Sequence, residues 1–103
     1  MAYKLMIPEH TTGQIGRCID YVVHVLHNFE AASAILDEIN EVYAILKMAP
    51  EAFSYCQDPC LQAKRYRKVP LKRHRYVFIY RIEEDKVYLL GFFHMMENYA
   101  KKL

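Results

Sequence analysis

Four residues in the second half of the chain carry side chains that could act on a phosphate ester: Arg75, Arg81, His94 and Tyr99. Histidine exchanges a proton near neutral pH, and cations beside a phenol can lower its pKa. In metal-free RNA cleavage a base takes the ribose 2′-hydroxyl proton, cations stabilise the pentavalent phosphate, and an acid protonates the leaving oxygen. The four residues suit this chemistry. A simpler interpretation stays open, in which His94 caps a strand end and Tyr99 packs against a sheet.

The strongest concentration of charge lies in Lys64–Arg75, KRYRKVPLKRHR, called here the basic segment. Its cations are Lys64, Arg65, Arg67, Lys68, Lys72, Arg73 and Arg75. It can be a solvated edge strand and turn, since lysine and arginine keep sheet edges from pairing. It can also bind nucleic-acid phosphates, with interleaved aromatic rings as stacking platforms, or dock an acidic segment of a partner protein. Composition alone does not choose between the last two interpretations.

Arg81 follows the basic segment along an apolar strand, YVFIYRI. Because side chains alternate along a strand, Arg75 and Arg81 are expected on one face together with Val77 and Ile79. An arginine at the end of a hydrophobic face needs a carboxylate or a bound anion. Pairing of Arg81 with an acidic residue of the EED turn, Glu83 or Glu84, fits the sequence at least as well as a functional role.

The chain length predicts one domain covering residues 1–103, since 103 residues can bury a single core. The net charge of +2 hides a division: residues 1–63 have a net charge of −5 and residues 64–103 a net charge of +7. Such asymmetry creates a local field that the total does not reveal.

No stretch of the sequence predicts a signal peptide or a membrane span, so we expect a cytoplasmic protein with no membrane contact. Its three cysteines, Cys18, Cys56 and Cys60, should then stay reduced. Cys56, Cys60 and His74 could supply three metal ligands, but a structural zinc site wants four ligands at tighter spacings. We therefore expect no metal and no other cofactor.

Apolar periodicity predicts the elements that position these residues. Residues 35, 39, 42 and 46 give the strongest helical period, with Asn28 as N-cap and Ala49-Pro50 as the end. An earlier helix is expected from a Thr11 or Thr12 cap to about residue 27. The other expected elements are strands at 3–7, 65–71, 75–82 and 86–93, and a loop at 51–63. The order β-α-α-β-β-β predicts an α+β fold, an antiparallel sheet with a helical hairpin packed on one face.

This order, the stretch YRKVP…RYVFIYRIEEDKVYLLGFFH and the tail ENYAKKL together resemble the RelE/ParE superfamily. Its members are the toxins of type II toxin–antitoxin modules, often described as plasmid stabilisation proteins. The similarity spans nearly the whole chain, and its specificity lies in the ordered combination rather than in one motif. It implies a compact toxin held inactive by a cognate antitoxin, which covers the sheet and its basic groove.

The resemblance implies two mechanisms. RelE-like members cut mRNA in the ribosomal A site without a metal, using central-strand cations and a C-terminal Tyr or His. The matching residues here are Arg67, Lys68, Arg75, Arg81, His94 and Tyr99. ParE-like members usually lack this set and act on DNA gyrase.

The tail HMMENY departs from the basic run of many relatives, with Met95 and Met96 at two Arg positions and Asn98 where Asp is usual. This departure weakens the ribonuclease interpretation without abolishing it. We predict cleavage of ribosome-bound mRNA. Binding of DNA gyrase without chemistry, and an inactive relative that only binds its antitoxin, are the alternatives.

Overall fold

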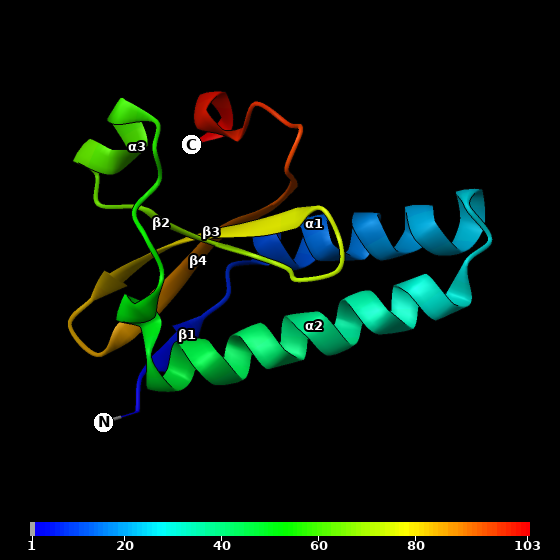
Figure 1. The fold of residues 1–103 in the computed structure, drawn as a ribbon, viewed down its shortest axis with the longest axis horizontal. Coiled ribbons are helices and arrows are strands. Elements are labelled where there is room, and N and C mark those ends of the chain that lie inside the picture. Colours follow the sequence, from blue (N-terminus) through cyan, green and yellow to red (C-terminus); the bar gives the residue numbers. More distant parts are fainter. Residues whose placement is uncertain (1) are drawn as a thin grey trace.

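Two long helices lie side by side over one face of a sheet in the computed structural model, which describes residues 2–103 (Figure 1). They are α1 (Glu9–Asp20) and α2 (Phe29–Met48), and the five-residue π-helical turn Tyr21–Val25 extends α1 towards the end of the hairpin. The strands are β1 (Lys4–Met6), β2 (Arg67–Pro70), β3 (Tyr76–Glu83) and β4 (Lys86–His94), in the sheet order β1-β4-β3-β2. The α+β class with a helical hairpin is confirmed.

The α2 helix forms where the apolar period predicts it. Its four periodic side chains are all buried: Ile35, Ile39, Val42 and Leu46. The predicted cap is also confirmed, because the Asn28 side chain accepts a hydrogen bond of 3.0 Å from the Ala31 amide. Burial of this stripe against the sheet, rather than helix propensity, provides most of the stability of such a helix.

The expected threonine cap of the first helix is wrong. The α1 helix begins at Glu9, after Pro8, and has no side-chain cap. Thr11 is instead fully buried, and its hydroxyl donates a 2.8 Å hydrogen bond to the carbonyl of Leu89 in β4. Gln14 of α1 likewise accepts a 2.9 Å hydrogen bond from the Phe92 amide. Side chains of α1 therefore satisfy the outer edge of β4 beyond the point where the short strand β1 ends.

One strand pair differs from the expected antiparallel sheet, because β1 runs parallel to β4. The α2 helix returns to the end of the sheet at which β1 begins, where the Tyr3 amide donates to the Lys47 carbonyl at 2.8 Å. The next strand, β2, therefore leaves in the same direction as β1. Two antiparallel pairings, β2 with β3 and β3 with β4, then make β4 parallel to β1.

The strand β3 is buried on both faces, as its apolar run predicts. Val77, Phe78, Ile79 and Tyr80 are each at most 3% exposed. Phe78 and Tyr80 join the core beneath α1 and α2, whereas Val77 and Ile79 join a second, smaller core on the opposite face. The segment 56–66 and the C-terminal segment 99–103 pack against this second core.

The expected loop at 51–63 is wrong in part. It contains a 3-10 turn, Pro50–Ala52, and the short helix α3 (Pro59–Ala63). The Asp58 carboxylate caps α3 by accepting from the amides of Cys60 and Leu61 at 2.9 and 3.1 Å. Pro59 occupies the first helical position, where its missing N–H costs nothing. Among the helices of residues 2–103, none is long and apolar enough to cross a membrane.

Candidate functional site

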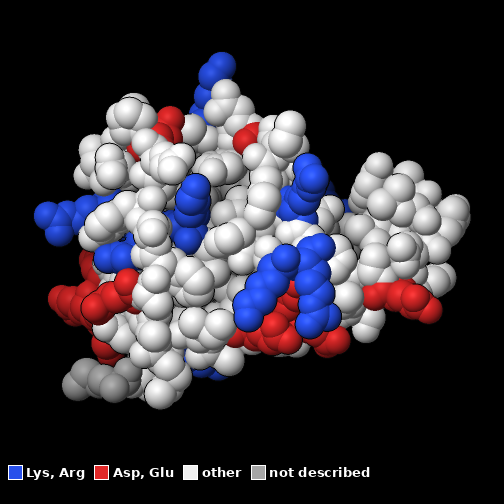
Figure 2. Space-filling model, viewed as in Figure 1, with Lys and Arg blue, Asp and Glu red and all other residues white. Residues whose placement is uncertain are grey.

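The basic segment does not form a single band of cations. Arg67 is used internally, since its guanidinium donates to the Phe53 carbonyl at 2.6 Å and lies 4.2 Å above the Tyr55 ring. At the start of the segment, the Lys64 ammonium donates to a C-terminal oxygen of Leu103 at 3.2 Å, and Arg65 has a positive φ of 61°. Figure 2 accordingly shows the lysines and arginines of one side of the molecule in several separate groups.

The end of the basic segment is fastened to α2. Glu38, buried within that helix, accepts a 2.7 Å hydrogen bond from the Arg73 amide, and its second oxygen lies 2.7 Å from His74 Nδ1. Lys72, Arg73 and Arg75 remain exposed. The loop before β3 is thus a fixed cationic projection beside α2, and Arg67 and Lys64 belong to other regions.

The two arginines expected on one face are far apart. Arg75 precedes β3, and Arg81 lies six residues further along the same strand, which corresponds to about 20 Å. Arg81 forms an ion pair with Glu83, and its guanidinium lies 4.5 Å above the Tyr88 ring. The simpler interpretation of Arg81, pairing across the turn, is the arrangement found. Both arginines therefore cannot contact one phosphate group.

His94 and Tyr99 lie on opposite faces of the sheet. The His94 ring meets Tyr76 edge-on at 5.3 Å, and Tyr76 packs with the core beneath the helices. The Tyr99 ring stacks on Phe93 at 5.6 Å and belongs to the core of the second face. Burial raises the pKa of Tyr99, with contributions from Cys56 and Asp58. The expectation that neighbouring cations lower the pKa of this phenol is therefore not met.

A groove on the second face brings two of the predicted residues together. Its volume is about 260 Å³, and its lining residues are Lys68, Pro70, Val77, Met95 and Tyr99. Lys68 is the only cation among these described lining residues. Met95, which lines the groove, is 41% exposed, and Met96, the next residue in the chain, is 79% exposed. This is a mainly apolar surface with one positive charge, and we call it the Lys68–Tyr99 groove.

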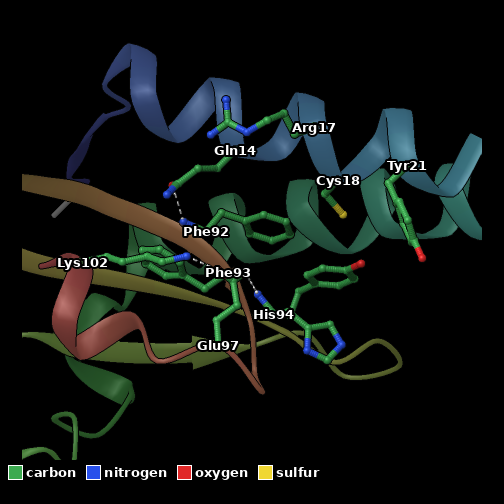
Figure 3. A pocket seen from close by; sticks show the side chains of 10 residues that line it. Gln14, Arg17, Cys18, Tyr21, Phe92, Phe93, His94, Glu97 and Lys102 are labelled. Atoms are coloured by element: carbon green, nitrogen blue, oxygen red, sulfur yellow. Dashed lines mark hydrogen bonds and ion pairs between the residues drawn. The ribbon is translucent and has the colours of Figure 1, made fainter.

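A pocket larger than this groove lies between α1 and the end of β4, with the C-terminal segment on its other side (Figure 3). We call it the α1–β4 pocket. Its volume is about 320 Å³, and its lining residues are Gln14, Arg17, Cys18, Tyr21, Tyr76, Phe92, Phe93, His94, Glu97 and Lys102. Of these, only His94 was predicted as a site residue. Four of the others could have been grouped from the sequence, because Gln14, Arg17, Cys18 and Tyr21 are spaced as one stripe of a helix.

Hydrogen bonds fix the polar groups of this pocket. His94 Nδ1 accepts a 3.1 Å hydrogen bond from the Met96 amide, so in the neutral ring the proton is on Nε2. Glu97 accepts from the His94 amide at 3.0 Å and from the Lys102 ammonium at 2.6 Å (Figure 3). These bonds, that of Lys102 first, lower the pKa of Glu97. Burial raises the pKa values of Tyr76 and Cys18.

With this geometry established, comparison with known proteins identifies the family. The sequence profile described as the ParE toxin of the type II toxin–antitoxin system parDE matches residues 13–99. None of the curated proteins matches the chain significantly. The fold is similar to a solved structure described as the chromosomal ParDE toxin–antitoxin system from P. aeruginosa. In that comparison the TM-score is 0.71 at 17% identity, covering 90% of this chain and 96% of the other. The chain therefore belongs to the ParE toxins of type II toxin–antitoxin systems.

Proposed function

We propose that this toxin inhibits growth by binding DNA gyrase, without cleaving RNA or catalysing another reaction. Family membership supports the target, since the ParE-like branch of the superfamily is the one that acts on gyrase. Membership also implies a cognate antitoxin that neutralises the toxin.

The separation of His94 from Tyr99 by the sheet is the observation that carries the proposal. A base and an acid that act on one phosphate must both reach it within hydrogen-bond distance. Here one ring packs against Tyr76 on the helix side, and the other packs against Phe93 on the second face. The raised pKa of Tyr99 and the pairing of Arg81 with Glu83 point in the same direction. The pair His94 and Tyr99, predicted to move protons in the cleavage of ribosome-bound mRNA, therefore does not meet at one site in residues 2–103.

The Lys68–Tyr99 groove is the surface that we propose for gyrase. Exposed apolar side chains next to a groove often mark protein interaction sites, and methionine adapts its shape to a partner. Met95 lines the groove and Met96 follows it, both exposed. The resemblance places them at positions where many relatives carry arginines. Their side chains offer contact area and no charge for a phosphate.

The test uses the purified protein in two assays in vitro: supercoiling by gyrase and translation of a reporter mRNA. We expect supercoiling to stop and the mRNA to stay intact. Met96→Glu should weaken gyrase inhibition about tenfold or more, because it places a charge in an apolar contact. Met48→Glu is the matched control, since Met48 is also exposed, by 68%, but lies at the end of α2. Cleaved transcripts together with unimpaired supercoiling would disprove the proposal.

A further inference from the structure

The α1–β4 pocket contains a cation that the fold itself does not use. Arg17 lines the pocket from α1, and none of the carboxylates in residues 2–103 forms an ion pair with it. The side chain runs along the helix towards Gln14 (Figure 3). Its guanidinium lies beside Gly13, where an added Cβ would be 3.4 Å from Arg17 Nη1, an ordinary contact distance.

The rest of the pocket is built for a group that is both anionic and partly apolar. The Tyr76 and Phe92 rings stack at 5.3 Å and form an aromatic wall. His94 can donate from Nε2, because its Nδ1 already accepts the Met96 amide. The volume of about 320 Å³ is in the range of small-ligand sites, so an acidic side chain has room to enter the pocket.

Charge decides between the classes of anion. Lys102 is neutralised by Glu97, which leaves Arg17 as the one uncompensated fixed charge among the described lining residues. A nucleic-acid backbone brings one phosphate after another and favours rows of cations. It would also meet the carboxylate of Glu97. A single carboxylate on an apolar stem matches one guanidinium, which can hold it through two parallel hydrogen bonds.

We propose that the α1–β4 pocket receives an aspartate or glutamate side chain of the cognate antitoxin, held by Arg17 and flanked by the Tyr76–Phe92 wall. The inference rests on membership of the toxin–antitoxin family and is independent of gyrase as the target. The α1–β4 pocket would give the antitoxin a specific contact on the helix side of the sheet, away from the Lys68–Tyr99 groove.

The first test measures the affinity of the purified toxin for its cognate antitoxin by calorimetry. Arg17→Gln should weaken binding about tenfold. Arg17→Lys should weaken it less, because lysine keeps the positive charge but lacks the two parallel N–H donors of the guanidinium. Lys47→Gln is the matched control: both residues are exposed cations in the last turn of a helix, and Lys47 lies outside the pocket. It should change affinity less than twofold. Equal affinities for the Arg17→Gln and Lys47→Gln proteins would overturn the proposal.

The second test needs no antitoxin. Benzoate carries a carboxylate on an aromatic ring, and benzamide is its uncharged counterpart. In NMR titrations, benzoate should shift the amide signals of residues 17, 18 and 92–94 more than benzamide does, and Arg17→Gln should abolish the difference. Equal shifts with both compounds would count against a carboxylate site. If Arg17→Gln weakened binding of a single-stranded oligonucleotide but left the antitoxin affinity unchanged, the pocket would be a nucleic-acid site. That result would also overturn the proposal.

Discussion

Glu38 of α2 holds the loop that carries His74. One carboxylate oxygen accepts from the Arg73 amide at 2.7 Å, and the other lies 2.7 Å from His74 Nδ1. A glutamate that is only 4% exposed is tolerated inside a fold because both of its oxygens have partners. The same contacts set the position of the cations at the end of the basic segment.

Loss of this carboxylate should destabilise the protein markedly. Glu38→Ala leaves the Arg73 amide without its acceptor, and we expect the free energy of unfolding to fall by about 2–3 kcal/mol. Urea denaturation measures the change. Glu41→Ala, at an exposed position of the same helix, should stay within about 0.5 kcal/mol of the wild type. Similar losses for both variants would show that Glu38 does not have this anchoring role.

The hydrogen bond between α1 and the edge of β4 gives a second prediction. Thr11→Val keeps the shape of the side chain but leaves the Leu89 carbonyl without its buried donor. We expect a loss of about 1–2 kcal/mol in urea denaturation. Thr12→Val is the control, because Thr12 is exposed and the substitution has a similar effect on helix propensity. If Thr11→Val cost no more than its control, the carbonyl would have another donor.

Two glycines should respond to alanine with opposite signs. At Gly91 in β4, a Cβ would lie 2.4 Å from the buried Phe93 ring, so we expect Gly91→Ala to cost about 1–3 kcal/mol. At Gly16 in α1, a Cβ meets nothing within 4 Å, and alanine favours a helix by about 0.5–1 kcal/mol. Melting temperatures should therefore fall for the first variant and rise for the second. A rise for Gly91→Ala would mean that the Phe93 ring can move aside.

The lowered pKa of Glu97 predicts a small dependence of stability on acid pH. A carboxylate whose pKa is lowered in the folded state contributes stability above its unfolded pKa, near 4.5, and loses it as the pH falls through the folded pKa. Because the ion pair with Lys102 is exposed, the contribution should stay below about 1 kcal/mol. Glu97→Gln should reduce the slope of melting temperature against pH below about pH 4.5. An unchanged slope would show that the pKa of Glu97 is not lowered in the folded protein.

Arg81 tests whether the central-strand arginines act in catalysis. Its guanidinium is already engaged by Glu83 and Tyr88, so Arg81→Ala should leave gyrase inhibition within about twofold. Arg81→Ala should also destabilise the fold by less than about 1 kcal/mol. Measurement of both quantities on one preparation separates a functional loss from a folding loss. A large fall in toxicity at unchanged stability would show that Arg81 is one of the residues required for toxicity.

The elements whose burial follows from local periodicity could be predicted from the amino-acid sequence. Examples are the α2 stripe, the Asn28 cap and the β3 run that is buried on both faces. Each depends on side chains that are neighbours along one helix or strand, so the pattern and the structure share one cause. The resemblance added the family, which the profile match supports over residues 13–99.

Contacts between side chains that are distant in the sequence could not be predicted and required the three-dimensional fold. Glu38 and His74 are 36 residues apart, and Thr11 and Leu89 are 78 residues apart, so no local period relates them. Charge density at Lys64–Arg75 suggested one surface, but the path of the chain ties Arg67 to Tyr55 and the loop before β3 to α2. His94 and Tyr99 are five positions apart in sequence, yet they pack on opposite faces of the sheet. Strand pairing and the return of the C-terminal segment fix these positions, because they depend on contacts among distant parts of the chain.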